Sequence, residues 1–340
     1  MITIELVTDK NIDEYDEFLE SNKESVCQQT TAWMNVIKNI SPDTPIFLMA
    51  KENDKIVAAM PNYLYKSEMG NIIVSIPHAG PYGGIICDAS DKSKIYESLT
   101  AKLFEIAKDN NCCLATIITP PFFSDFNIYN SAITPDYAVE NFYQFIDLEN
   151  FSPKRDVKRR IEESKNNGLV ISEDSSMDNI LEWYEIHKKR MGELNARSLP
   201  LEIFIKSAKM NKSKFFFVLK DKKIISGTML IFHNQVIDVY MISMDSDYDN
   251  LLPNFFLMDN VIRWAKLEGF KYMNWESSPS RDSGTYLFKS RWGSLEGKHH
   301  ILTKVLGNIN KLKQTSLEDV KKAYPWHYVL PYSLWGVKSK

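Results

Sequence analysis

The sequence predicts a mixed α/β fold built from two tandem units with the same order of elements. In each half, strands joined by tight turns are followed by a helix that crosses over to a further strand. The turn sequences Asn53-Asp54-Lys55 and Asp221-Lys222-Lys223 separate β-rich runs at matching places in the two halves. With 340 residues, the chain also exceeds the usual size of one compact core. We therefore expect two domains, each with a mostly antiparallel mixed sheet flanked by helices.

In the first half, hydrophobic periodicity predicts several strands around one long helix. The predicted strands are Ile2–Val7, Ile46–Lys51, Ile56–Tyr65, Asn71–Ile76, Gly84–Cys87, Cys113–Ile118 and Phe142–Leu148. The predicted helices are Ile12–Glu20, Thr31–Ile40 and Lys92–Lys108. Asn11 stands just before the first helix, where a short polar side chain is favoured as an N-cap.

The second half shows the same order. Its predicted strands are Leu169–Glu173, Phe215–Leu219, Ile224–Phe232, Val236–Ser243, Tyr272–Glu276 and Ile301–Val305. Its predicted helices are Asp178–Arg190, Leu201–Ala208 and Asn254–Glu268. The last of these carries apolar residues at helical spacing and is followed by Gly269, which suits the position after a helix end.

These elements divide the chain into a first domain of residues 1–150 and a second of residues 151–310. The link between the element sets, Phe151–Gly168, contains a basic helix that is either a solvated linker or a surface facing phosphates. The segment 311–340 contains Trp326 and Trp335 and is too aromatic to extend freely into water. We expect it to pack back onto the first domain.

The composition excludes several classes of protein. The chain is 44% hydrophobic and 25% charged with a net charge of −3, which gives no general attraction to DNA. No apolar run approaches the ~18 residues that a membrane-spanning helix needs, and the N-terminus does not read as a signal peptide. The spacing of Cys27, Cys87, Cys112 and Cys113 fits neither a disulfide framework nor a zinc site. We therefore expect buried thiols, no metal and a cytoplasmic protein.

The segment 271–293 concentrates polar and aromatic side chains in one predicted strand–loop–helix unit. Loops held by rigid elements often carry binding groups. Glu276 ends the strand, where a carboxylate could bind or deprotonate an amine. Arg281 could grip a carboxylate or phosphate, as could Arg190 from an earlier helix. Tyr286 lies in the segment that follows the loop, and we expect it to contact substrate.

Several local patterns, in order along the chain, resemble the FemABX-like peptidyl- and acyltransferases, which carry two domains of the GNAT acyltransferase fold. The patterns are Gln29-Thr30-Thr31-Ala32-Trp33, Ser75-Ile76-Pro77, Pro81-Tyr82-Gly83-Gly84, Lys158-Arg159-Arg160-Ile161, His187-Lys188-Lys189-Arg190-Met191-Gly192, Pro253, and Ser283 to Lys289 before Trp292-Gly293. The last pattern looks closest to the members associated with surface polysaccharides. The resemblance places a Fem-family lysine at Lys289, and we expect this lysine to be exposed on a short helix with its ammonium reaching a cleft.

The resemblance implies an N-acyltransferase or aminoacyltransferase that forms an amide on an amino sugar or peptide of a cell-wall or surface-polysaccharide precursor. Lys289 would stabilise the developing oxyanion or hold a donor phosphate, with Glu276 as its catalytic partner. The expected co-substrate is acyl-CoA or aminoacyl-tRNA, with no tightly bound cofactor. Two departures from the family pattern bear on the donor. The coiled-coil arm of some tRNA-dependent members is missing, and the loop Asp245–Asn250 is acidic where GNAT enzymes have a glycine-rich pyrophosphate loop. We expect such a loop to repel an anion, which argues against coenzyme A as the donor.

Other residues complete the predicted site. Trp33 could stack a sugar or base, and Tyr240 could present its hydroxyl to a cleft. Asn254 opens a helix whose N-terminus could supply N–H donors to the acyl donor, with Arg159 as a basic contact. The alternatives are a tRNA-dependent aminoacyl ligase and a catalytically silent glycan- or nucleotide-binding protein of the same fold.

Overall fold

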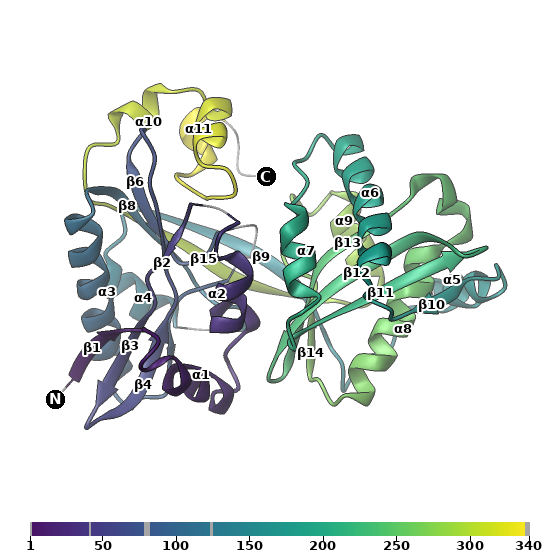
Figure 1. The fold of residues 1–340 in the computed structure, drawn as a ribbon, viewed down its shortest axis with the longest axis horizontal. Helices are drawn as coiled ribbons and strands as arrows, with labels where there is room; N and C mark the ends of the chain where they lie inside the picture. The colour runs from purple at the N-terminus through teal and green to yellow at the C-terminus, as the bar shows by residue number, and fades with distance from the viewer. Residues whose placement is uncertain (1, 41, 78–81, 123–124, 337–340) are drawn as a thin grey trace. The chain divides into compact units, whose positions relative to one another are not determined.

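The computed structural model describes residues 2–40, 42–77, 82–122 and 125–336. They form two compact units, shown in Figure 1. The first unit comprises residues 1–142 and 297–340, and the second comprises residues 143–296. The chain leaves the first unit within β9 (Tyr137–Asp147) and re-enters it within β15 (Leu295–Val305).

These limits differ from the predicted ones, 1–150 and 151–310. Residues 297–310 belong to the first unit because Ile301–Val305 of β15 pair with β8 (Cys112–Ile118) of that unit. Strand pairing joins segments far apart in sequence, whereas the prediction divided the chain at its linkers. Residues 337–340 of the predicted tail, together with Pro81 of the family pattern, lie outside the described residues.

The first unit contains two sets of strands. One sheet has the order β1-β3-β4-β7 and is antiparallel throughout. The other strands follow the order β15-β8-β6-β5-β2, with a parallel pair between β6 and β8. The strands that have not been given above are β1 (Ile2–Leu6), β2 (Thr44–Pro45), β3 (Leu48–Glu52), β4 (Lys55–Met60), β5 (Tyr63–Tyr65), β6 (Asn71–Val74) and β7 (Ile86–Cys87).

Helices cover these strands. They are α1 (Ile12–Ser21), α2 (Thr31–Ile37), α3 (Lys92–Asp109) and α4 (Phe126–Ile133), with the 3-10 turn η1 (Cys27–Gln29) before α2. The buried face of α3 repeats at helical spacing, with Ile95, Leu99 and Leu103 packed in one cluster with strand residues. Asn11 precedes α1 as predicted, but its side chain bonds the Thr8 amide and the Leu6 carbonyl, so it does not cap the helix.

One predicted strand of the first unit is two strands. The run Ile56–Tyr65 breaks at Pro61, because proline has no N–H for a strand ladder. The two pieces, β4 and β5, pair in different sets of strands. The turn before β4 was placed correctly, and Asn53 and Asp54 take φ values of 51° and 62°, as a tight hairpin turn requires.

The C-terminal segment packs within the first unit. After β15 it forms α10 (Asn310–Gln314), α11 (Leu317–Ala323) and the 3-10 turn η3 (Tyr332–Trp335). The Tyr324 hydroxyl donates to the Gly70 carbonyl at 2.7 Å, and Leu312 and Leu330 share a buried cluster with residues of β5, β6 and β8. His327 Nε2 lies 2.8 Å from a buried Asp43 carboxylate oxygen. Tyr324 is therefore core, whereas Trp326 and Trp335 are half-buried and Tyr332 is exposed.

The second unit has one sheet with the order β10-β11-β12-β13-β14-β9. Its pairs are antiparallel except for β13 with β14, which is parallel. The strands are β10 (Val170–Ser172), β11 (Ser213–Lys220), β12 (Lys223–His233), β13 (Val236–Met244) and β14 (Tyr272–Asn274). The helices are α5 (Arg155–Lys165), α6 (Met177–Glu193), α7 (Leu201–Ser207), α8 (Pro253–Leu267) and α9 (Gly284–Arg291), with the 3-10 turn η2 (Ser246–Leu251) before α8.

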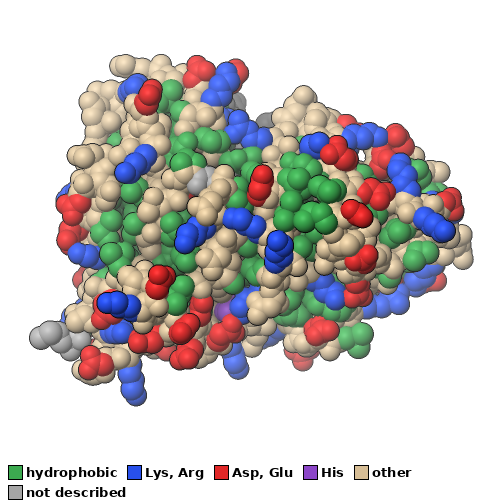
Figure 2. All heavy atoms as spheres, viewed as in Figure 1, with side chains coloured by type: hydrophobic (Ala, Val, Ile, Leu, Met, Phe, Trp, Pro, Cys, Tyr) green, Lys and Arg blue, Asp and Glu red, His purple; other side chains and the backbone are tan. Residues whose placement is uncertain are grey.

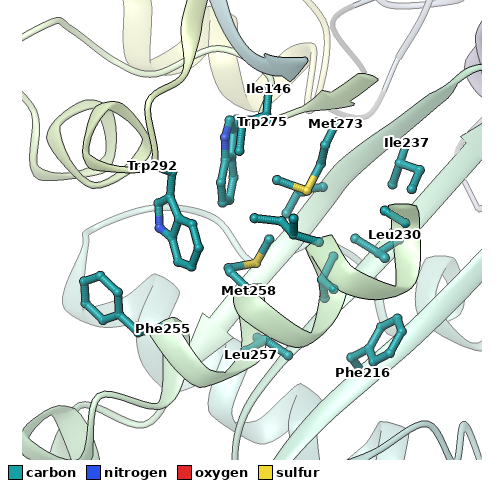
Figure 3. Packing of buried hydrophobic residues seen from close by; sticks show 14 of the residues in the cluster. Ile146, Phe216, Leu230, Ile237, Phe255, Leu257, Met258, Met273, Trp275 and Trp292 are labelled. Atoms are coloured by element: carbon teal, nitrogen blue, oxygen red, sulfur yellow. The ribbon is translucent and has the colours of Figure 1, made fainter. Parts of the chain in front are cut away.

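The core of this unit lies between the sheet and α8. Leu257 and Met258 of α8 share one buried cluster with Ile237 and Met273 of the sheet, and Figure 3 shows Trp275 and Trp292 at one end of it. The strand predicted as Tyr272–Glu276 ends at Asn274, and Glu276 takes a φ of 59° that no strand permits. The predicted mixed α/β fold class is confirmed. No helix in the described ranges is both long and apolar enough to cross a bilayer.

Gly227 provides a test of the packing in the second unit. A Cβ at this position would lie 2.7 Å from Phe217 and 2.8 Å from the Trp183 indole nitrogen. We expect Gly227→Ala to lower the free energy of unfolding by about 1–3 kcal/mol, because ring atoms on both sides would have to move. Gly192→Ala is the matched control, since nothing lies within 4 Å there and the helix gains propensity. Urea denaturation measures both free energies of unfolding. Equal values for Gly227→Ala and Gly192→Ala would contradict this packing.

The buried His299 should make the stability of the first unit depend on pH. Burial, with His300 beside it, lowers the pKa of His299 to about 3, so the folded chain holds it neutral. Below about pH 6.5 the unfolded chain binds a proton that the folded chain does not, so stability falls as pH drops from there toward 3. Its ring packs edge-on to Tyr82 at 5.4 Å, which a phenylalanine can replace. His299→Phe should therefore lose less melting temperature between pH 7 and pH 4.5 than the unsubstituted protein, and equal losses would refute this.

Candidate functional site

A cavity of about 800 Å³ lies in the second unit, beside the N-terminus of α8. Its lining comes from α5, α6, the end of β13, the loop before α8, α8 itself and α9: Arg160, Arg190, Met191, Leu194, Ile242, Ser243, Met244, Asp249, Leu252, Pro253, Asn254, Phe255, Gly284, Thr285, Leu287, Phe288 and Arg291. Figure 2 shows hydrophobic side chains gathered on the surface where Figure 1 labels α6, α7 and α9. The cavity is large enough for an extended small-molecule ligand.

The sheet helps to form this cavity, because β13 is longer than its parallel partner. Pairing with β14 covers only Val236 to Asp238 of β13. The strand continues to Met244 without that neighbour, and Ile242, Ser243 and Met244 line the cavity. The end of β13 therefore presents side chains to a ligand.

The N-terminus of α8 opens on the cavity. Leu252 has a left-handed φ of 57° and is followed by Pro253 in the first turn of the helix. Proline at this place costs no hydrogen bond, because the first amides of a helix have no partner within it. The Phe255 and Phe256 N–H groups donate to the Leu252 carbonyl at 3.1 and 3.3 Å, so the Asn254 N–H and the positive end of the helix dipole are what this turn offers to an anion. The predicted donor contact Asn254 is in the cavity wall.

Three arginines, Arg160, Arg190 and Arg291, line the same cavity. Arg160 stacks its guanidinium over the Phe255 ring at 5.3 Å. The predicted Arg190 forms an ion pair with Glu193 at 2.7 Å. Guanidinium groups bind phosphate and carboxylate through paired N–H donors. The three arginines and the positive end of the α8 dipole thus lie around the same cavity.

Arg159, the predicted donor contact, is not in the cavity wall. Its side chain is 67% exposed and pairs with Glu163 at 3.4 Å. The buried side of α5 consists of Val157, Ile161 and Ser164. One residue turns a helix by about 100°, so Arg160 lies toward that side and Arg159 toward solvent. The basic run indicated the right helix but the wrong arginine.

The acidic loop before α8 is largely neutralised. Lys189 binds carboxylate oxygens of Asp245 at 2.6 Å and Asp247 at 2.9 Å, and Lys223 lies 3.6 Å from Asp245. Asp249 is the aspartate of this loop that lines the cavity. The expectation that the loop would repel an anion treated its carboxylates as unpaired, and the folded chain pairs two of them.

The two predicted catalytic residues lie together, beside the loop that joins β14 to α9. The Lys289 ammonium donates to the carbonyls of Glu276 at 3.2 Å and Ser277 at 2.9 Å. Burial lowers the pKa of Lys289 to about 8, although the nearby Glu276 opposes this. Lys289 is not among the cavity-lining residues of α9. It is also buried, where we had expected an exposed lysine on a short helix.

Glu276 occupies a strained position. Its φ of 59° is unusual for a residue with a side chain. Its Oε1 is buried with no hydrogen-bond partner. Burial, followed by the charge of Asp238, raises the pKa of its carboxyl well above the usual range, and Lys289 acts in the opposite direction. A raised pKa makes the ionised carboxylate a stronger base.

The remaining predicted contacts fall into two groups. Arg281 binds both carboxylate oxygens of Glu296, at 3.0 and 2.6 Å, and the Tyr286 hydroxyl donates to the same carboxylate at 3.1 Å. Trp33 and Tyr240 are buried core residues, with 0% and 5% of their surface exposed. A ligand cannot stack on a side chain that has no exposed face, so Trp33 is better explained as core.

Sequence reasoning missed Arg160, Arg291, Ser243 and Thr285 as cavity residues. The phase of α5 relative to Val157 and Ile161 could have identified Arg160. No pattern in the sequence distinguished Ser243 from other strand residues. The described residues contain no group of three histidine, cysteine, aspartate or glutamate side chains placed to hold a metal ion.

Comparison with known proteins agrees with this geometry. Residues 153–276 match the acetyltransferase (GNAT) domain family, and this match covers the elements that surround the cavity from α5 to the end of β14. No curated protein sequence matches the chain.

Solved structures extend the likeness to nearly the whole chain. A crystal structure of FemX superposes with a TM-score of 0.73 at 12% identity, covering 90% of this chain and 98% of FemX. The C-terminal domain of a putative lysylphosphatidylglycerol synthetase from Agrobacterium fabrum gives 0.62 at 12% identity, covering 94% and 99%. A tandem GNAT protein from the clavulanic acid biosynthesis pathway gives 0.57 at 9% identity, covering 91% and 99%. The chain therefore has a fold like that of FemX and of the tandem GNAT protein, and its residues 153–276 match the acetyltransferase (GNAT) domain family.

Proposed function

We propose that this protein is an N-acyltransferase or aminoacyltransferase that forms an amide on an amino sugar or peptide of a cell-wall or surface-polysaccharide precursor. The cavity of the second unit carries this proposal. It combines three arginines, the N-terminus of α8 and an apolar wall, which suits a donor with phosphate groups and a carbon chain. The GNAT domain match covers most of this wall.

The amide-forming chemistry is assigned to the loop between β14 and α9. An amine acceptor must lose a proton as it attacks, and Glu276 has a buried carboxyl oxygen without a partner. The Lys289 ammonium, held beside it, would offset the negative charge that develops on the attacked carbonyl. Arg281 and Tyr286, joined through Glu296, are proposed to contact the acceptor.

Two classes of donor fit a cavity of this kind. Acyl-CoA offers phosphates and an extended thioester arm. Aminoacyl-tRNA offers phosphodiesters, and Lys154, Arg155, Lys158 and Arg159, the exposed cations of α5 and its start, favour this alternative. Thermal unfolding of the full chain with acetyl-CoA, a charged tRNA or neither separates them, because a ligand of the folded state raises the melting temperature. If neither donor raised it, the catalytically silent binding protein would be the better account.

Arg160 and Arg159 form a matched pair for testing the donor cavity. Arg160→Ala should weaken binding of the active donor about tenfold, because it removes a charge-assisted contact from the cavity wall. Arg159→Ala should leave the affinity for an acyl-CoA donor unchanged, since that side chain points to solvent and pairs with Glu163. Isothermal titration of the donor measures both. Equal losses from the two variants would indicate a general charge effect and refute the assignment.

Lys289 should be needed for turnover. We expect Lys289→Ala to lower kcat on the order of a hundredfold, as for loss of one preorganised electrostatic contact. The ammonium is the active form, so the rate should fall as pH rises through about 8, the pKa to which burial lowers this lysine. Steady-state kinetics of acyl transfer from pH 6 to 10 measures both effects.

The control separates this role from a structural one. Lys289 also binds two loop carbonyls, so Lys289→Ala should lose stability as well, contrary to what its expected exposure implied. Lys289→Arg keeps the charge at all these pH values and should abolish the fall above pH 8 while restoring part of the rate. If the rate of Lys289→Arg still fell above pH 8, the titrating group would be a residue other than Lys289.

A further inference from the structure

A serine in the wall of the cavity has a hydroxyl group whose role is set by a buried histidine. Ser243 lies near the end of β13, is 2% exposed and lines the cavity. His187 of α6 is fully buried, and its Nδ1 lies 3.1 Å from Ser243 Oγ. Neither residue has a role in the chemistry described above. Their contact determines whether the Ser243 hydroxyl donates or accepts a hydrogen bond at the cavity wall.

The histidine tautomer follows from its second contact. The backbone N–H of Leu199 donates to His187 Nε2 at 3.2 Å, so this nitrogen is an acceptor. Burial lowers the pKa of His187 to about 4, and the ring is neutral at physiological pH. A neutral imidazole has one N–H, which must therefore be on Nδ1. His187 thus donates to the Ser243 hydroxyl.

The hydroxyl group in turn must donate its own proton elsewhere. Within the described ranges, the contact with His187 is the hydrogen bond made by Ser243 Oγ, and it uses the oxygen as an acceptor. The Ser243 carbonyl is separately fixed by Trp183 Nε1 at 3.2 Å, which anchors the strand. The O–H of Ser243 therefore remains available to a ligand in the cavity.

The neighbours of Ser243 are also donors. Asn254 Oδ1 accepts from Ser226 Oγ at 2.8 Å, which leaves its NH₂ group for the cavity that it lines. Arg190 follows His187 by three residues on α6 and lines the same cavity, and the backbone N–H of Asn254 is the first amide of α8. A group that only accepts hydrogen bonds, such as a phosphate, matches this set.

We propose that Ser243 is a phosphate-binding residue of the donor cavity, held as a hydrogen-bond donor by His187. This inference rests on the proposed function, because it assigns one contact of the donor site. The same tautomer excludes a nucleophilic role for the serine. A histidine nitrogen that carries a proton cannot remove one from Ser243, so no acyl-serine intermediate forms.

Calorimetric titration of the full chain with inorganic pyrophosphate tests the assignment. Ser243→Ala should raise the Kd about tenfold, as expected for loss of a hydrogen bond to a charged ligand. Ser164→Ala is the matched control, because its buried hydroxyl donates to the Ile161 carbonyl at 2.7 Å and is not in the cavity wall. His187→Asn retains an N–H donor on the same side chain and should keep most of the affinity.

Each other outcome has a definite meaning. An unchanged Kd in Ser243→Ala, with Arg160→Ala weakened, would overturn this inference and leave the proposed donor cavity intact. Acylation of Ser243, seen by mass spectrometry after incubation with acetyl-CoA, would overturn it as well. If the unsubstituted protein did not bind pyrophosphate, the phosphate site itself would be refuted, and the proposed function would lose its main support.

Discussion

The packing of the N-terminus of α8 against α9 is the interaction on which the candidate site depends. Phe255 of α8 lies 5.5 Å from Phe288 of α9, and it stacks on Trp292 at 5.9 Å. Trp275 joins the cluster from the end of β14, 6.4 Å from Trp292. Aromatic rings bury large apolar areas with defined geometry. This cluster therefore fixes both walls of the cavity, since Phe255 and Phe288 also line it.

The same cluster links the cavity to the proposed catalytic loop. Trp275 is buried next to Glu276, and the loop from Glu276 to Ser283 leads into α9. Gln144 of β9 donates to Ser290 Oγ of α9 at 2.9 Å, and Lys289 holds the carbonyls at the start of the loop. Glu276 can keep its strained φ because these neighbours leave its backbone no other position. This strained residue stands two positions after the end of β14.

Charge in the second unit is distributed by pairing. The acidic turn before α8 has its carboxylates taken by Lys189 and Lys223, while Arg190 is oriented by Glu193. Ser246 also donates to Glu193 at 2.9 Å, so the turn and the arginine share one carboxylate. Outside these pairs, the charged groups of the cavity wall are the Asp249 carboxylate and the Arg160 and Arg291 guanidinium groups.

Local sequence determined the fold class and most elements of this protein. Hairpin turns at Asn53-Asp54 and Asp221-Lys222 and the apolar face of α8 are set by short-range preferences, which periodicity reveals. The polar loop after β14 was likewise recognisable, because its residue types are concentrated in one segment. Glu276 follows from its place at the predicted strand end and Lys289 from the resemblance to the Fem family, and the folded chain brings the two residues together.

Tertiary structure decided what depends on distant partners. The unit limits follow from the pairing of β15 with β8, which are far apart along the chain. Arg160 rather than Arg159 lines the cavity because of how α5 packs, and Trp33 is core because other residues cover it. Lys289 is buried because the loop folds back over it. The proton on His187 is set by the Leu199 amide and Ser243, two partners that no local pattern in the sequence brings together.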